Sequence, residues 1–233
     1  QESLKNHEKI GFYKSKNILI NNGVCTNKFY PRKQSYFKIR KLLHLENDSF
    51  LIGHIARFHP IKGHKILLNS LKLLKRENKN FKCLMIGTNV NKNNQLLNNE
   101  IKKNKLEENI MLYGETKYPQ ELINAFDINI ISSLSESCSL VLLEAMASGV
   151  PTLSTNVGEI KKIIGKTGLV VNNKSSRDLA DKLIFLIKNR SYLKEKSFLA
   201  RERIKKKYSL EQMLKKYNLI YKFFLKKSRV FKY

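Results

Sequence analysis

Short apolar runs alternate with stretches of helical periodicity through the middle of the chain. The runs are typical of buried strands, and we predict strands at residues 50–55, 81–86, 109–113, 128–131, 152–155 and 168–171. Between them, apolar residues recur three and four positions apart. This spacing predicts helices at residues 65–75, 91–104, 121–125 and 140–148. Repeated strand–helix alternation indicates an α/β fold with a Rossmann-like, doubly wound parallel sheet.

The two ends of the chain have a different pattern. Residues 1–33 contain a weak helix and an Asn-Asn-Gly turn signal, with little periodicity up to Lys33, so we interpret their second half as a linker. From Asp178 the pattern is helical almost to the end, and the clearest break is at Tyr208-Ser209. We therefore expect an N-terminal segment at 1–33, a Rossmann-like domain at 34–207 and extra C-terminal helices that end with 208–233.

The composition has one unusual feature, a formal net charge of +26. Such a charge is typical of proteins that bind nucleic acid or anionic membranes. Lysine greatly outnumbers arginine, however, and the lysines are spread along the chain rather than gathered in one segment, which favours compositional drift in an AT-rich genome. Nucleic-acid readers rely on arginine for bidentate contacts, so no nucleic-acid partner is expected. A basic nucleic-acid-binding module is kept as an alternative.

Cysteine usage and hydropathy restrict the compartment and the kind of site. The three cysteines have no Cys-x-x-Cys spacing, so we expect neither a disulfide framework nor a zinc site. No apolar run approaches the ~20 residues that a membrane-spanning helix needs. These features predict a cytoplasmic protein, with peripheral contact at the inner face of the membrane as a possibility.

Two cations follow the first predicted strand. Arg57 and Lys62 lie on one short loop, and Gly63 leads into the next helix. An open parallel sheet binds its ligands beyond the carboxyl ends of its strands, and the N–H groups at a helix start favour anions. The loop is therefore a candidate diphosphate site, although solvated basic residues are the ordinary alternative.

Two acidic residues flank the start of the predicted helix at 140–148. Glu136 lies in the preceding loop and Glu144 lies two turns inside the helix, while Ser137 or Ser139 can cap its first turn. Glu144 interrupts an apolar run, so its carboxylate must find hydrogen-bond donors, either from sugar hydroxyls or in a salt bridge inside the fold. After the next strand, Gly158 is suited to close approach of a ligand or to a plain turn.

Together these motifs resemble the family-4, or group 1, glycosyltransferases, which have the two-domain GT-B fold. Glu136 and Glu144 match the family's E-x7-E pattern, and the segment 140–151 around Glu144 is similar to its most recognisable stretch. Arg57 and Lys62 match its donor-phosphate loop, and residues 20–24 match its interdomain linker. The resemblance covers roughly residues 17–225 and identifies the chain as the C-terminal, donor-binding half, with most of an acceptor-binding N-terminal domain missing.

The resemblance implies a role for each matched residue. Arg57 and Lys62 would neutralise the donor diphosphate, and Glu136 would hold hydroxyls of the donor sugar. Glu144 would hydrogen-bond the ribose. The remaining implied donor-binding positions are the N–H groups near Ser139 and Leu140, which would face the phosphate, Gly114 beside the base, and Gly158. The family retains anomeric configuration and uses no metal, so no metal or other cofactor is expected.

The implied function is transfer of a sugar from a UDP- or GDP-sugar to a glycan or lipid-linked acceptor in bacterial surface polysaccharide synthesis. This chain alone is expected to be inactive in transfer. A nucleotide-sugar epimerase of GT-B fold is the alternative enzyme. One departure concerns the phosphate loop, where Ser137-Cys138-Ser139 replaces the family's usual Gly-Phe-Gly.

The last predicted helix is amphipathic. Its apolar residues recur at helical spacing and its other face is rich in lysine; the apolar positions are Tyr217, Ile220, Tyr221, Phe224 and Leu225. In GT-B enzymes the C-terminal helix packs back on the N-terminal domain, and we expect the same here. A helix lying on an anionic membrane is the alternative.

Overall fold

The computed structural model describes residues 8–13, 17–46, 48–78, 80–172 and 175–230. Its centre is a six-stranded sheet of order β3-β2-β1-β4-β5-β6 in which every neighbouring pair is parallel. The strands are β1 (Phe50–Ile55), β2 (Phe81–Ile86), β3 (Ile110–Gly114), β4 (Ile128–Ile131), β5 (Thr152–Thr155) and β6 (Leu169–Val171). All six predicted strands are present, and the strand order confirms the Rossmann-like, doubly wound sheet.

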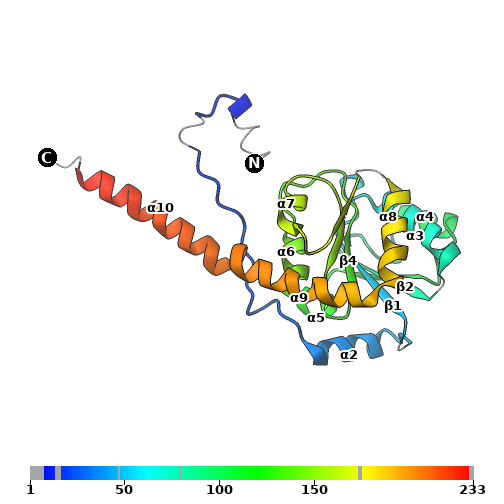
Figure 1. The fold of residues 1–233 in the computed structure, drawn as a ribbon. Helices are drawn as coiled ribbons and strands as arrows, with labels where there is room; N and C mark the ends of the chain where they lie inside the picture. Colours follow the sequence, from blue (N-terminus) through cyan, green and yellow to red (C-terminus); the bar gives the residue numbers. More distant parts are fainter. Residues whose placement is uncertain (1–7, 14–16, 47, 79, 173–174, 231–233) are drawn as a thin grey trace.

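Helices cover both faces of this sheet (Figure 1). One face carries α3 (His64–Glu77), α4 (Gln95–Lys103) and α8 (Ser176–Lys188). The other carries α5 (Pro119–Ile123), α6 (Leu140–Ala147), α7 (Ile160–Ile164) and α9 (Arg190–Lys207). Adjacent strand residues supply the two cores, since Leu51 belongs to one and Ile52 to the other. Burial on both faces explains why these strands, apart from β5, are mainly apolar runs without a polar alternation.

Several boundaries differ from the prediction. The helix expected at 91–104 begins only at Gln95, because the Asn94 side chain accepts the N–H of Leu97 and caps it there. The one at 121–125 is shifted to Pro119–Ile123, since proline fits the first turn. The five-residue α7 is too short to show a period and was not predicted.

A further helix, α2 (Lys33–Leu42), begins where the linker was expected to end. Buried polar contacts fix it to the domain. Arg40 donates to the Ala125 carbonyl at 3.3 Å and to the Asp127 carboxylate at 3.1 Å. Part of the N-terminal segment predicted at 1–33 lies outside the described residues, namely 1–7 and 14–16.

The break predicted at Tyr208-Ser209 is confirmed, and α10 (Leu210–Val230) starts after it with Ser209 accepting the N–H of Gln212 at 3.3 Å. Val24 of the linker pairs with this break through 2.9 Å bonds to Tyr208 and Leu210. Beyond it, α10 extends away from the sheet (Figure 1), and Tyr221, among others, is 61% exposed. The apolar face of α10 is therefore exposed in this chain, and its predicted packing on an N-terminal domain stays a prediction. None of the helices in the described ranges is long and apolar enough to cross a membrane.

Candidate functional site

The order in which successive strands are added to the sheet reverses between β1 and β4. These strands are parallel neighbours, yet the loop after β1 leads to α3 on one face and the loop after β4 leads to α6 on the other. Such a switch point opens a crevice at the carboxyl edge of a doubly wound sheet. The two loops are the ones that carry Lys62 and Glu136.

Hydrogen bonds join these two loops to each other. The N–H of Leu134 donates to the carbonyl of Ile61 at 2.7 Å, and the Ser132 hydroxyl donates to the carbonyl of Lys62 at 3.0 Å. Gly63 has a φ of 66°, and a Cβ atom there would lie 1.9 Å from the Ser132 carbonyl oxygen. Only glycine therefore allows this approach, which fixes the Lys62 side chain beside the second loop.

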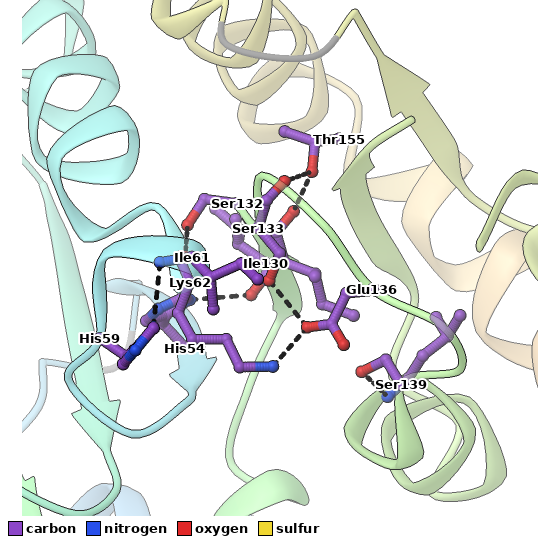
Figure 2. A network of polar contacts seen from close by, with 12 residues as sticks. His54, His59, Ile61, Lys62, Ile130, Ser132, Ser133, Glu136, Ser139 and Thr155 are labelled. Atoms are coloured by element: carbon purple, nitrogen blue, oxygen red, sulfur yellow. Dashed lines mark hydrogen bonds and ion pairs between the residues drawn. The ribbon is translucent and has the colours of Figure 1, made fainter. Parts of the chain in front are cut away.

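An ion pair spans the crevice (Figure 2). The Lys62 Nζ lies 2.6 Å from Oε1 of Glu136, and the same oxygen accepts the Ser133 hydroxyl at 2.8 Å. The Thr155 hydroxyl of β5 donates to the Ser133 carbonyl at 2.6 Å. Both charged side chains are mostly buried, 24% exposed for Lys62 and 11% for Glu136. The site is thus organised by residues from three chain segments.

Gly158 supports the same loop from the other side. It follows β5 with a φ of 53°, and a Cβ atom there would lie 1.8 Å from the Glu136 carbonyl oxygen. The backbone at 158 therefore packs directly on the backbone that carries Glu136. The structure shows Gly158 in contact with this loop, so its close approach to a ligand stays a prediction.

Helix α6 begins at the crevice. Of the two serines considered as caps, Ser139 caps it, with its hydroxyl 3.4 Å from the N–H of Leu142. Leu140, the first helical residue, is 53% exposed. The first N–H groups of a helix have no partner inside it, and its dipole favours an anion at this end.

Glu144 is half-buried on α6 and lies outside the Lys62–Glu136 network. Within the described part of the chain its carboxylate has no hydrogen-bond or ion-pair partner. Burial raises the pKa of the Glu144 carboxyl, and the positive charge of Lys28 partly opposes this shift. The described residues therefore do not form the internal salt bridge to Glu144 that was the alternative.

Two predicted residues lie at the same edge without joining the network. Arg57 is exposed in the loop after β1, and no described residue pairs with its guanidinium. Gly114 ends β3 with a φ of 83°, and a Cβ atom there would meet nothing within 4 Å. Both positions are open to a ligand, and their roles stay predictions.

Sequence reasoning missed the residues that position Glu136. Ser133 lies three positions before it. Thr155 ends β5, whose sequence Thr-Leu-Ser-Thr places polar residues in a buried strand, and this signals a function at the sheet edge. It also missed a buried pair, His54 and His64, whose rings lie 5.0 Å apart. Burial lowers the pKa of His54 to about 4 and that of His64 to about 3, so both are neutral at pH 7.

Comparison with known proteins agrees with this geometry. Residues 35–219 match the family described as "Glycosyl transferases group 1". The chain belongs to the group 1 glycosyltransferases. Among its relatives, the capsular polysaccharide biosynthesis glycosyltransferase CapM of Staphylococcus aureus is 28% identical over 210 residues, which are 89% of this chain and 54% of CapM. The poly(ribitol-phosphate) alpha-N-acetylglucosaminyltransferase of the same species is 30% identical over 170 residues, which are 72% of this chain and 34% of that enzyme.

Solved structures share the fold of this group 1 glycosyltransferase chain. A glycosyltransferase from Rickettsia africae superimposes with a TM-score of 0.86 at 24% identity, over 96% of this chain and 62% of that one. Anabaena HepE in complex with UDP and glucose gives 0.86 at 20% identity, over 94% and 60%. The chain spans only 54%, 39% and 34% of the first three curated relatives, so activity of a whole protein is a separate inference.

The donor atoms at the site also bear on metal binding. No three His, Cys, Asp or Glu side chains of the described residues are grouped so that they could hold a metal ion. At the crevice the Glu136 carboxylate is paired with the ammonium group of Lys62, and it does not belong to a cluster of carboxylates among the described residues. That catalysis needs no metal stays a prediction.

Proposed function

We propose that this chain is the donor-binding half of a retaining glycosyltransferase that transfers a sugar from a UDP- or GDP-sugar. The observation that carries the proposal is the carboxyl-edge crevice, where Lys62, Glu136 and the start of α6 lie together at a topological switch point. A nucleoside diphosphate sugar needs a cation for its phosphates and acceptors for its hydroxyls, and the crevice offers both.

The ion pair has to change partners when a donor binds. Without a ligand, Glu136 neutralises Lys62. In the proposed complex Lys62 turns to the diphosphate, where it and Arg57 stabilise the departing nucleotide, and Glu136 accepts hydroxyls of the sugar. Ser133 keeps Glu136 in place during this exchange, because its hydroxyl bonds Oε1 independently of Lys62.

The start of α6 and its second turn bind the rest of the nucleotide in this proposal. N–H groups near Ser139 and Leu140 face the phosphate. The Glu144 carboxylate, which has no partner among the described residues, accepts from the ribose. The base lies against the open backbone at Gly114. Retention follows from a donor phosphate oxygen that takes the acceptor's proton on the face from which the nucleotide leaves, with no metal needed.

The acceptor proposed is a glycan or lipid-linked sugar in bacterial surface polysaccharide synthesis. Support comes from the names of relatives, which include CapM and the O-antigen biosynthesis glycosyltransferase WclY of Escherichia coli. HepE, solved with UDP-glucose, supports a nucleotide-sugar donor. We place the protein in the cytoplasm, where nucleotide sugars are made, with peripheral contact at the inner membrane face where lipid-linked acceptors lie.

The test is direct binding to residues 1–233. Isothermal titration with UDP, GDP and their sugars should show one site, without transfer to any acceptor. Glu144→Gln should weaken nucleotide binding by about 10- to 100-fold, the worth of a charged hydrogen bond of about 1.5–3 kcal/mol. Glu121→Gln on α5, also half-buried, is the matched control and should leave affinity unchanged.

Other outcomes would point elsewhere. Absence of binding to every nucleotide sugar by a folded chain would contradict the proposal. Interconversion of a UDP-sugar into its epimer by a longer form would favour the epimerase. Tight binding to DNA or RNA that falls steeply with salt would favour the nucleic-acid module suggested by the net charge of +26.

A further inference from the structure

A second cavity lies at the opposite, amino edge of the sheet. Its volume is about 510 Å³, and its walls come from the turns before β4 and β5, from the linker and α2, and from the first half of α9. Asp127 immediately precedes β4 and Pro151 immediately precedes β5. The strands therefore separate this cavity from the crevice that holds Lys62 and Glu136. Its size is that of a small-molecule site.

The charges around the cavity favour an anion. Four cations line it, namely Arg32, Lys33, Arg190 and Lys194, against one acid, Asp127. That acid is already neutralised, since its carboxylate lies 3.1 Å from Arg40 and 3.6 Å from Arg190, and it accepts the Leu51 N–H at 2.7 Å. Arg190 therefore has a partner in Asp127, while Arg32, Lys33 and Lys194 have no acidic partner among the described residues.

Two buried polar atoms of the walls lack partners among the described residues. They are the hydroxyl of Ser148, at the end of α6, and Nε of Arg32. Arg32 is otherwise held in place, because its terminal nitrogen donates to the Lys28 carbonyl at 3.0 Å and its guanidinium lies 4.4 Å from the Tyr30 ring. Buried groups without a partner are rare in folded proteins, and both of these can donate to an anion.

The remaining wall is apolar apart from Asn124 and Ser197. Tyr36, Val150, Pro151 and Leu193 contribute to it. Inorganic phosphate would leave such a surface uncovered, whereas an anion attached to a small apolar body would bury it. We propose that this cavity is a second ligand site, which binds a small organic anion with a phosphate or carboxylate group on an apolar body.

The position of the site suggests what binding would do. Arg32 and Lys33 follow the linker, and Arg190 and Lys194 lie on α9. The same two segments meet again at the other end of α9, where Val24 bonds Tyr208 and Leu210 at the start of α10. An anion held between them would fix the linker against α9 and so restrain how α10 leaves the domain. This inference does not depend on the proposed donor.

Phenyl phosphate is the probe for this site, titrated into residues 1–233 by calorimetry at constant ionic strength. The double variant Lys33→Ala/Lys194→Ala removes two exposed wall cations, and affinity should fall about fivefold or more. The control Lys38→Ala/Lys206→Ala removes two exposed lysines of α2 and α9 that do not line the cavity. It carries the same net charge and should bind like the unmodified chain.

The chemical class is tested with simpler probes. Phenol and inorganic phosphate should each bind more weakly than phenyl phosphate, by about tenfold or more, because each lacks one half of the interaction. Benzoate should compete, as a carboxylate on the same ring. Equal loss in the two double variants would overturn the proposal, and so would affinity that is lost in Arg57→Ala, since Arg57 lies at the carboxyl edge. Retained affinity in Arg57→Ala supports a site separate from the donor crevice.

Discussion

The two acidic residues near the start of α6 are held in opposite ways. Glu136, in the loop, shares one oxygen between Lys62 and Ser133 at 2.6 and 2.8 Å. Glu144, two turns into the helix, is half-buried with no partner in the described chain, and burial raises the pKa of its carboxyl. A paired carboxylate contributes to folding, whereas an unpaired one costs stability and is retained where a ligand supplies the missing donors.

This difference separates structure from function within one motif. Substitution of Glu136 should change both the stability of the loop and the affinity for the donor. Substitution of Glu144 should change mainly the affinity for the donor. The four predictions below test that contrast through the free energy of unfolding, measured by urea denaturation on variants of the full chain.

The largest effect is expected for Gly158→Ala. The new Cβ atom would lie 1.8 Å from the Glu136 carbonyl oxygen, at a φ of 53° that alanine adopts reluctantly. We expect a loss of about 3 kcal/mol or more from the clash and the backbone strain together. Gly114→Ala is the matched control, because its φ of 83° is also positive and its Cβ atom would meet nothing. It should cost only about 1 kcal/mol, and equal losses would show that the 158 contact does not support the loop.

The Lys62–Glu136 pair should give the next largest effect. Lys62→Met removes the partner of a carboxylate that is only 11% exposed, so we expect a loss of about 1–3 kcal/mol. A double-mutant cycle with Glu136→Gln isolates the pair, and its coupling energy should exceed about 1 kcal/mol. Additive losses would mean that the two charges are independently solvated.

These two predictions concern contacts that the sequence did not reveal. The strand runs and the break at Tyr208-Ser209 are local patterns, and the structure confirms them at nearly the predicted residues. Which loops meet is decided by strand order, which a single sequence does not specify. The placement of β1 beside β4 is what brings Lys62 to Glu136, residues 74 positions apart.

The helices α7 and α2 were also missed. Helix α7 has five residues, fewer than two turns, and α2 is fixed by Arg40 to distant carbonyl groups. Glu144 shows the reverse case. Its carboxylate in an apolar run predicted a need for donors, and the structure leaves that need unmet within the described residues.

A smaller effect is expected for Ser133→Ala. The variant removes one hydrogen bond to Oε1 of Glu136 but leaves Lys62 in place, so the loss should be about 0.5–1.5 kcal/mol. Nucleotide-sugar affinity should fall as well, because Glu136 gains freedom to rotate. Ser135→Ala, in the same loop and exposed, should change neither quantity. If the two serine variants behave alike, Ser133 does not position Glu136.

The smallest effect should have the opposite sign. Glu144→Gln keeps the volume and removes a buried charge, so the variant should be equally stable or more stable at pH 7, by under about 1 kcal/mol. The sign follows from linkage. The folded-state pKa of Glu144 lies above its ordinary value of 4.5, so at neutral pH the folded chain bears the burial penalty of the charged form.

As pH falls through the raised pKa, the folded carboxyl takes up its proton first and the penalty disappears. The stability difference between Glu144→Gln and the unmodified chain should therefore shrink with acid and vanish below about pH 4.5, where both states are protonated. Using the difference cancels the titration of His54 and His64, whose depressed pKa values destabilise the fold as the pH falls below 6.5. If the variant is less stable than the unmodified chain at pH 7, the Glu144 carboxylate contributes to folding stability, as that of Glu136 does.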